Sequence, residues 1–319
     1  MLLSRREAII GATAIAATAV VRIPARAAPP AVNFLVLGDW GRDGASHQQD
    51  VADAMGRSAK QIGSRFVVTV GDNFYDNGVQ SADDPQWQSS FEHVYTAPSL
   101  QTPWYASLGN HDYRGNPQAQ LEYAGSSKRW RLPSRYYKIA GVDIGAPHLD
   151  LFILDTSPLV NKYRTESDGP IRANVLTQDT RTQLAWLDRE LAASRAPWKL
   201  VAGHHPIFSG GSSHGNTPEM IAQVEPILKR HGVQAYLAGH DHDLQFLDRD
   251  GLSLIQTGAG SEVRPVQAVE GTEYCNARSG FTCLRSDPDM LSLEFVDYTG
   301  GSLFKRNIGR EIARSRRAA

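Results

Sequence analysis

Five short motifs in this chain place a polar side chain directly after a glycine. They read Gly38-Asp39-Trp40-Gly41, Gly71-Asp72-Asn73-Phe74-Tyr75, Gly109-Asn110-His111-Asp112, Val201-Ala202-Gly203-His204-His205 and Gly239-His240-Asp241-His242. A single Gly-Asp pair usually caps a turn, whereas five motifs that all carry oxygen or nitrogen donors predict a metal site. Mixed carboxylate and imidazole ligands suit iron, zinc or manganese. The motifs hold no thiolate, which argues against a closed structural zinc site.

Each motif follows a predicted strand. The strands are short apolar runs rich in β-forming residues: Val32–Leu37, Phe66–Val70, Trp104–Leu108, Leu149–Leu154, Trp198–Ala202 and Ala235–Ala238. Helical patterns separate them: Gln48–Ile62, Gln86–Tyr95, Thr180–Ala193 and Glu219–His231. Alternating strands and helices predict a layered α/β architecture. In such folds the carboxyl ends of the strands build the site, so we expect the five motifs to converge.

The chain changes character beyond residue 250, where short strands follow one another without helices. These predicted strands are Leu252–Gln256, Phe281–Arg285, Met290–Asp297 and Ser302–Lys305. Because no helix connects them, we expect a second, largely antiparallel sheet layer.

The composition describes a globular chain without a basic surface. Of the 319 residues, 41% are hydrophobic and 21% are charged, which suffices for one substantial core in a single α/β domain. The formal net charge of −1 argues against nucleic acid as the main partner. No exposed apolar helix or charge stripe indicates a protein partner, so we expect a monomer.

The first 27 residues have the pattern of an export signal peptide. Ser4-Arg5-Arg6 precedes an apolar run of 14 residues from Ala8 to Val21, and Ala25-Arg26-Ala27 offers a cleavage site. The paired arginines indicate the twin-arginine route, with ordinary secretion as the alternative. The run is too short to span a bilayer, which takes about 20 residues. We therefore expect an exported protein, periplasmic or extracellular, with no stable membrane anchor after the signal is removed.

The C-terminal part of the chain has two smaller features. Cys275 and Cys283 lie close together in a turn-rich stretch, and in an oxidising compartment a local disulfide is expected between them. Residues 309–319 are rich in arginine and are expected to form a solvated basic tail.

The order of the five motifs resembles that of the calcineurin-like metallophosphoesterases. Tyr75, three residues after Asp72, is similar to the tyrosine of the purple acid phosphatases, and the match is closest to their small, single-domain, tartrate-resistant type. The resemblance runs from about Phe34 to Lys305. It implies a four-layer α/β/β/α sandwich of two mixed sheets flanked by helices, with one catalytic domain over residues 30–308. It also implies an acid phosphatase that hydrolyses phosphate monoesters with a metal-bound hydroxide nucleophile.

The resemblance further implies a centre with two metal ions. By matching position, the ligands expected for Fe(III) are Asp39, Asp72, Tyr75 and His242. Asp72 is expected to bridge to a second metal, Fe(II), Zn(II) or Mn(II), whose other ligands are Asn110, His204 and His240. Two metal ions can clamp the attacking and leaving oxygens of an in-line displacement. The hard, anionic phenolate of Tyr75 favours the trivalent ion.

Three side chains are expected to face the substrate. His111 resembles the family's catalytic histidine, which we assign to leaving-group protonation or phosphate binding. His214 resembles a second substrate-facing histidine, with an exposed loop histidine as the alternative. Asn110 is expected to contact the substrate as well as the metal.

Other polar residues beside the motifs receive different interpretations. His205 stands where close relatives usually carry tyrosine, and neighbours on an extended backbone point in opposite directions, so we interpret it as pocket wall. Asp112 and Asp241 are expected to orient imidazole ligands. The polar segment Ser157–Gln178 is expected to lack regular structure, and loops of that size are usually functional or mobile. The resemblance implies that this segment covers the site and that its cleavage regulates activity.

Two other functions fit the same residues. One is a phosphodiesterase or nucleotide phosphoesterase on the same site, although Tyr75 weighs against most of that group. The other is an iron-binding or redox protein, in which His111 and His214 would have little purpose.

Overall fold

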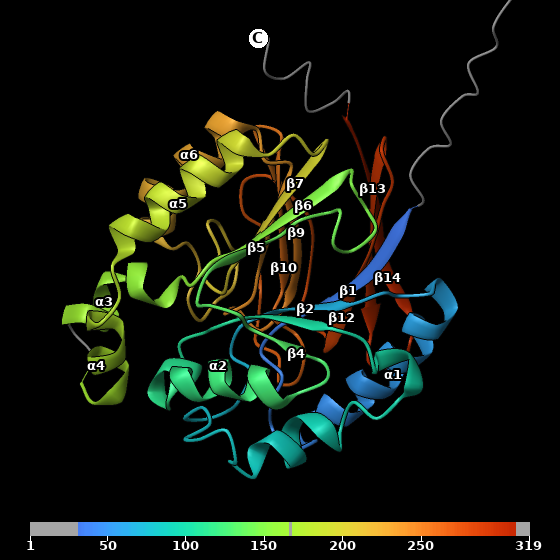
Figure 1. Cartoon of the computed structure of the whole chain (residues 1–319). Coiled ribbons are helices and arrows are strands. Elements are labelled where there is room, and N and C mark those ends of the chain that lie inside the picture. Colours follow the sequence, from blue (N-terminus) through green and yellow to red (C-terminus); the bar gives the residue numbers. More distant parts are fainter. Residues whose placement is uncertain (1–30, 166–167, 311–319) are drawn as a thin grey trace, which may run out of the picture.

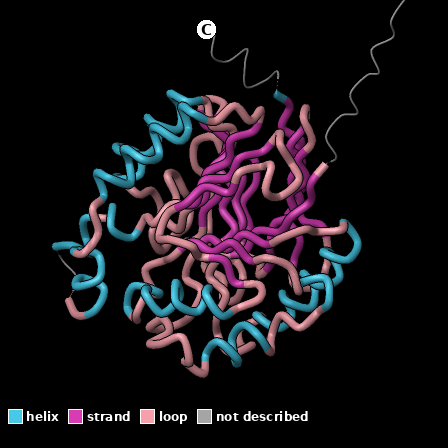
Figure 2. Tube along the Cα trace, in the orientation of Figure 1, coloured by secondary structure: helices cyan, strands magenta, loops and turns pink. Residues whose placement is uncertain are grey.

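Two seven-stranded sheets form the centre of the computed structural model, which describes residues 31–165 and 168–310. The first sheet has the order β14 (Ser302–Gly309), β13 (Met290–Asp297), β12 (Gly280–Ser286), β1 (Val32–Leu37), β2 (Val67–Val70), β3 (Trp104–Ser107) and β4 (Trp130–Arg131). The second has the order β11 (Thr272–Asn276), β9 (Leu244–Arg249), β10 (Leu252–Thr257), β8 (Ala235–Ala238), β7 (Trp198–Ala202), β6 (Leu149–Ile153) and β5 (Tyr137–Ile139). Helices lie outside both sheets (Figures 1 and 2). The predicted sandwich of two mixed sheets flanked by helices is confirmed.

Parallel strands carry the site in both sheets. In the first sheet β1, β2, β3 and β4 pair in parallel, and in the second sheet β6, β7, β8 and β10 do so. Antiparallel strands then extend each sheet, β12–β14 on one side of β1 and β9 and β11 beyond β10. The loops after β1, β2, β3, β7 and β8 are the five motifs, so parallel pairing brings three of them to the carboxyl edge of the first sheet and two to that of the second.

The strands beyond residue 250 do not form a separate layer, and this expectation is wrong. Strand β12 pairs antiparallel with β1, with Leu35 opposite Cys283, and β13 and β14 continue the first sheet from there. Strand β10 instead joins the second sheet, parallel to β8. Alternation of apolar residues identifies a strand but carries no information about which sheet its edge will meet, so the partner could not be read from the sequence.

The helices cover the two outer faces (Figure 1). They are α1 (Gln48–Ile62) and α2 (Pro117–Ser126) over the first sheet, and α5 (Thr180–Ala193) and α6 (Glu225–His231) over the second. Helix α1 ends at Gly63, whose φ of 64° suits the left-handed C-cap position. Helix α5 begins at Asp179, whose side chain accepts hydrogen bonds from the amides of Arg181 and Thr182. Both helices have the predicted bounds.

The other two predicted helices are shorter or divided. Gln86–Tyr95 contains only a six-residue π-helix, Trp87–Glu92. In Glu219–His231, a π-helical turn at Met220–Val224 precedes α6. Proline lies in the first turn of α6, where its missing N–H costs nothing.

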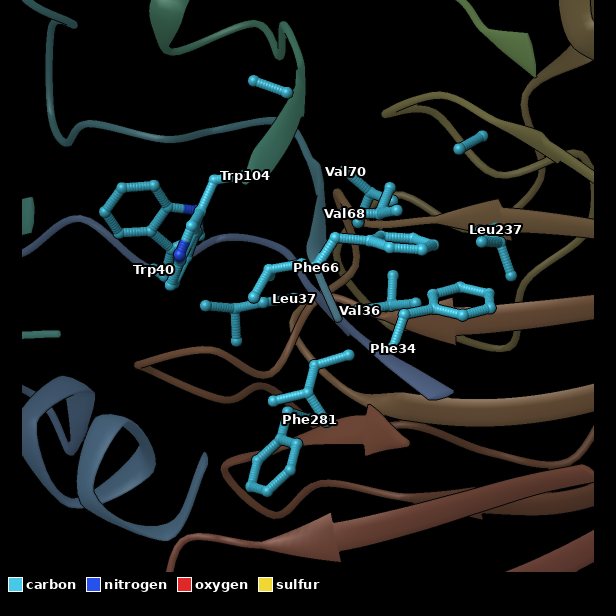
Figure 3. Packing of buried hydrophobic residues seen from close by; sticks show 14 of the residues in the cluster. Phe34, Val36, Leu37, Trp40, Phe66, Val68, Val70, Trp104, Leu237 and Phe281 are labelled. Carbon is cyan, nitrogen blue, oxygen red and sulfur yellow. The ribbon is translucent and has the colours of Figure 1, made fainter. Parts of the chain in front are cut away.

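The core fills the space between the sheets and extends under the helices. Figure 3 shows Phe34 and Val36 of β1 on the side of Leu237 from the second sheet, with Trp40 and Trp104 on the other side of the strand. All five side chains are fully buried. A strand with both faces covered holds its terminal residues firmly, which is what a metal site at its end requires.

The segment Ser157–Gln178 is mostly helical, so the expectation of an irregular loop is wrong. It contains a 3₁₀ turn (Ser157–Leu159), α3 (Asn161–Thr165) and α4 (Pro170–Leu176). Helices of five and seven residues are too short to show a clear apolar period, which is why the sequence pattern missed them. Asn174 of α4 donates hydrogen bonds to the carbonyls of Tyr113 and Gly115, both at 2.9 Å, and so ties the segment to the turn that follows the third motif.

The predicted disulfide is also wrong in this structure. Cys275 lies in β11 of the second sheet and Cys283 in β12 of the first, and both thiols are free. The stretch between them crosses from one sheet to the other and is not a local turn. The predicted signal peptide, residues 1–27, lies outside the described residues, as does most of the predicted tail, 309–319. No helix among the described residues is long and apolar enough to cross a membrane.

Candidate metal centre

Four of the predicted ligands meet around the hydroxyl of Tyr75. Its oxygen lies 3.0 Å from Oδ1 of Asp39, 3.1 Å from Oδ2 of Asp72 and 3.0 Å from Nε2 of His242. Asp39 follows β1, Asp72 follows β2 and His242 follows β8, so the group draws on both sheets. All four side chains are buried.

The other three predicted ligands meet around His204. Its Nε2 lies 3.1 Å from Oδ1 of Asn110 and 3.1 Å from Nδ1 of His240. The same nitrogen lies 3.3 Å from Oδ2 of Asp72. One carboxylate oxygen therefore contacts both groups, at the position where a bridging ligand is expected.

These donors fit metal ions better than they fit one another. Nδ1 of His204 lies 2.9 Å from the carbonyl of Val70, so its N–H donates there and the lone pair of Nε2 faces the site. The carboxylates of Asp39 and Asp72 are fully buried beside that nitrogen. Carboxylate, amide, phenol and imidazole donors together suit iron, zinc or manganese. The residues present thus fit a pair of cations.

The electrostatics of the site point the same way. Burial, and after it the negative charges of Asp39 and Asp72, raises the pKa of Tyr75 well above its ordinary value. Burial likewise raises the pKa of Asp39, against the opposing influence of His204. Burial thus favours the protonated form of both groups, and a metal ion would supply the compensating charge that their anionic forms need.

The backbone of the ligands is held in an uncommon conformation. Asp39, Asp72 and His240 have φ values of 60°, 48° and 76°, in the left-handed region that non-glycine residues seldom adopt. A glycine makes the close packing here feasible, because a Cβ on Gly109 would lie 2.2 Å from Oδ1 of Asp72. Strained residues of this type cluster at functional sites, where the surrounding fold holds them in place.

His111 lies at the first ligand group. Its backbone N–H donates to Oδ1 of Asp72 at 2.7 Å, and its ring lies 4.3 Å from the ring of Tyr75. Nδ1 is 2.6 Å from the carbonyl of Asp76, to which it donates, and Nε2 is 4.0 Å from Oδ2 of Asp72. The free lone pair or proton of Nε2 therefore faces the site.

His214 lies at the second ligand group. Its ring stacks on the ring of His240 with a centroid distance of 3.9 Å and an angle of 23°. Asp241 holds the loop, because its carboxylate accepts hydrogen bonds from the hydroxyl of Ser209 and the amides of His214 and Gly215. The structure thus brings His214 to the site, although its outer side is exposed.

The two aspartates predicted to orient imidazoles do something else. Asp241 binds the loop backbone described above. Asp112 accepts hydrogen bonds from the amides of Gly109 at 2.8 Å and Asn73 at 3.1 Å, and from the side chain of Gln120 at 2.8 Å. Both residues therefore position backbone rather than imidazole, and that expectation is corrected.

His205 does not point away from the site. Its ring lies 4.4 Å from that of His240 and 4.9 Å from that of His204. Nδ1 lies 2.8 Å from Oγ1 of Thr156, and Nε2 lies 3.1 Å from the hydroxyl of Tyr163. Its ring is buried against the rings of these two candidate ligands, so the expectation that it points the other way is wrong, and its role as pocket wall stays a prediction.

Some neighbours of the candidate ligands carry little or no signal in the sequence. Tyr163 lies far from the motifs along the chain, in the polar segment that showed no pattern, whereas Thr156 directly follows the predicted strand Leu149–Leu154 and belongs to the Asp155-Thr156 stretch that supports the resemblance. The guanidinium of Arg42 lies 3.8 Å from the ring centroid of Tyr75, and only its place shortly after the first motif could have suggested this contact.

Comparison with known proteins agrees with this geometry. The family model described as calcineurin-like phosphoesterase matches residues 32–244. The chain is 43% identical to purple acid phosphatase 17 of Arabidopsis thaliana, over 89% of this chain and 86% of that protein. It is 37% identical to tartrate-resistant acid phosphatase type 5 of Sus scrofa, over 91% of this chain and 90% of that protein.

A solved structure shares the fold. It is described as GAP50, the anchor in the inner membrane complex of Plasmodium, and superposes with a TM-score of 0.72 over 90% of this chain and 94% of that one, at 23% identity. The chain therefore belongs to the calcineurin-like phosphoesterases, as a homologue of the small, tartrate-resistant purple acid phosphatases, which are metal-dependent phosphomonoesterases.

Proposed function

We propose that this chain is an acid phosphatase that hydrolyses phosphate monoesters on a dinuclear centre. Fe(III) would be held by Asp39, Asp72, Tyr75 and His242, and a second ion, Fe(II), Zn(II) or Mn(II), by Asp72, Asn110, His204 and His240. The observation that carries the proposal is the position of Asp72, whose Oδ2 is 3.1 Å from the hydroxyl of Tyr75 and 3.3 Å from Nε2 of His204. One oxygen in contact with both donor groups is suited to two adjacent ions.

When bound, such a metal pair supplies Lewis acidity and a hydroxide nucleophile near neutral or acid pH. The protein has to hold the phosphate in line and provide a proton for the leaving oxygen. His111 is suited to this, because Asp76 fixes its ring through Nδ1 and leaves Nε2 toward the site. A positioned acid of this kind typically contributes about 10²–10⁴-fold in rate.

His214 and Asn110 are proposed to bind the phosphate. Oδ1 of Asn110 is directed at His204, so its Nδ2 hydrogens remain for a phosphate oxygen. The ring of His214 stacks on the ring of His240, which holds it beside the second ligand group. Both side chains donate hydrogen bonds, which suits a phosphate group.

We also propose that the protein is exported to the periplasm or the extracellular space. The support is the sequence of residues 1–27, with Arg5 and Arg6 before an apolar run. Sequencing the N-terminus of the exported protein tests this: a mature chain that begins after Ala27 supports export with cleavage, and a retained first residue contradicts it.

The test of the activity combines metal analysis with kinetics. The purified, metal-loaded chain should hold about two metal ions, at least one of them iron, and turn over a chromogenic phosphate monoester at pH 5. His111→Ala should lose about 10²-fold or more in turnover and keep its metals. A faster rate on diesters would favour a phosphodiesterase, and iron binding without turnover would favour a redox or iron-binding protein.

A further inference from the structure

A hydrogen-bonded chain connects helix α3 to the second ligand group. Thr156 follows β6, His205 follows the ligand His204, and Tyr163 lies on α3. The relative exposures of the three side chains are 0%, 1% and 5%, so each of their polar atoms needs a partner.

Counting donors and acceptors determines the direction of each bond. Oγ1 of Thr156 lies 3.2 Å from the amide nitrogen of His204 and 3.1 Å from that of His205, and both amides can only donate. These two bonds occupy both lone pairs of the hydroxyl. Its own proton must therefore go to Nδ1 of His205, at 2.8 Å.

The tautomer of His205 follows from this bond. Because Nδ1 accepts, the neutral ring carries its proton on Nε2, which donates to the hydroxyl oxygen of Tyr163 at 3.1 Å. The opposite arrangement would direct three donors at the two lone pairs of Thr156 and leave the proton of Thr156 without an acceptor. It would satisfy fewer groups in a fully buried position.

These hydrogen bonds leave the O–H proton of Tyr163 free to bind an acceptor. Since the oxygen accepts from His205, the proton has no acceptor among residues 31–165 and 168–310. Burial, and after it the charge of Asp72, raises the pKa of Tyr163 well above its ordinary value, so the phenol remains a donor. The hydroxyl contacts a ring that itself packs against His240 at 4.4 Å.

We infer that Tyr163 is a substrate-binding residue whose hydroxyl donates a hydrogen bond to a phosphate oxygen, with Thr156 and His205 as the positioning residues that direct this proton. The inference rests on the proposed phosphatase function and extends it to a helix outside the five motifs. It also assigns a purpose to His205 other than metal binding. His205 lies close enough to His204 and His240 to be counted among candidate ligands, but both of its nitrogens are occupied.

The experiment measures binding of inorganic phosphate to the metal-loaded chain by calorimetry, together with kcat, KM and metal content. Tyr163→Phe should weaken phosphate binding and raise KM by about tenfold, with metal content unchanged. Thr156→Val should weaken phosphate binding similarly, and Thr156→Ser, which keeps the hydroxyl, should restore it. The matched control is Tyr137→Phe, whose hydroxyl donates to the carbonyl of Ala106 at 2.9 Å, away from the ligand groups.

Each outcome decides the question. If Tyr163→Phe binds phosphate as the wild type does, the inference is wrong. It is also wrong, and Tyr163 is structural, if the variant loses metal and stability while the molecules that keep their metal bind phosphate with unchanged affinity. If Tyr137→Phe weakens phosphate binding equally, the effect is general destabilisation and the inference also fails. If the wild-type chain neither binds phosphate nor turns over a phosphate monoester, the proposed function itself is contradicted.

Discussion

Oδ2 of Asp72 lies 3.3 Å from Nε2 of His204, and this contact joins the ends of two different sheets. Asp72 follows β2 of the first sheet and His204 follows β7 of the second. The site is therefore assembled only when the two sheets pack correctly, and the core between them sets the spacing of the ligands. Metal binding and sheet packing should stabilise each other.

Replacing Asp72 by asparagine should remove the shared ligand with almost no change in volume. An amide can offer only one lone-pair-bearing oxygen and no negative charge, so we expect at least one of the two metals to be lost. Activity should fall by more than about 100-fold, since even changes to residues behind metal ligands cost about 10–100-fold. Elemental analysis beside kinetics checks this, with Asp289→Asn, exposed in the turn between β12 and β13, as the control. Two metals retained at full affinity would show that Asp72 is not shared.

Gly109→Ala should distort the site through a single methyl group. The new Cβ would lie 2.2 Å from Oδ1 and 2.3 Å from the amide nitrogen of Asp72, and neither atom can move freely because β2 is buried. We expect lower metal occupancy and a melting temperature lower by several degrees. Gly125→Ala in α2 is the matched control, because nothing lies within 4 Å of its added Cβ. If both variants behave alike, close packing at Gly109 has no role in the site.

The candidate metal donors could be predicted because each of their motifs follows a buried strand and contains a glycine. Asp39 and Asp72 stand at the ends of apolar runs whose parallel pairing is common in layered α/β folds, so their convergence followed from the pattern. Tyr163 could not be predicted in the same way. It lies on a helix of five residues, and its contact with His205 depends on how that short helix packs.

The pairing of the strand that contains Cys283 could not be predicted for the same physical reason. Cys283 was visible as part of a strand, but its pairing opposite Leu35 depends on which edge of which sheet remained free. The sequence pattern shows which side of a strand is apolar. Which other strand it pairs with depends on the folded chain. For this reason the expectation of a separate sheet layer beyond residue 250 was wrong, although the bounds of most of these strands were close.

Asp155 should make folding stability depend on pH. Burial raises the pKa of its carboxyl to about 7, against the opposing effects of Arg135 and of the hydrogen bond from Tyr113. Oδ1 has no hydrogen-bond partner among the described residues, which suits a protonated carboxyl. The folded chain then keeps the proton up to about pH 7, while the unfolded chain loses it near pH 4. The stability contributed by this proton is fully present below about pH 4 and is lost as the pH rises through about 7.

Asp155→Asn should remove this part of the pH dependence. The amide is neutral at every pH and nearly the same size, and the backbone contacts of Asp155 with Gln183 remain. Thermal unfolding at saturating metal, measured from pH 4 to pH 8, should show the wild type losing stability relative to the variant as the pH rises. A constant difference between the two curves would mean that Asp155 does not titrate in this range.

Lys162 should contribute to substrate affinity through its charge. Its ammonium lies 5.0 Å from the ring centroid of Tyr163. The pKa of His214 is lowered to about 4, mainly by burial of its ring and next by the positive charge of Lys162. A positive charge that acts at His214 also acts on a phosphate dianion bound beside it. Lys162→Gln should therefore raise KM by about two- to fivefold, as expected for an exposed charge.

The salt dependence separates this electrostatic effect from a change of shape. Added salt screens exposed charges, and at an ionic strength of 0.5 M the Debye length is only about 4 Å. The difference in KM between Lys162→Gln and the wild type should therefore shrink as the ionic strength rises toward 0.5 M. Lys60→Gln, at the far end of α1, is the matched control and should leave KM unchanged. A difference in KM that persists at high salt would indicate that the side chain of Lys162 acts by contact or by packing on Tyr163, and the assignment of its effect to charge would be wrong.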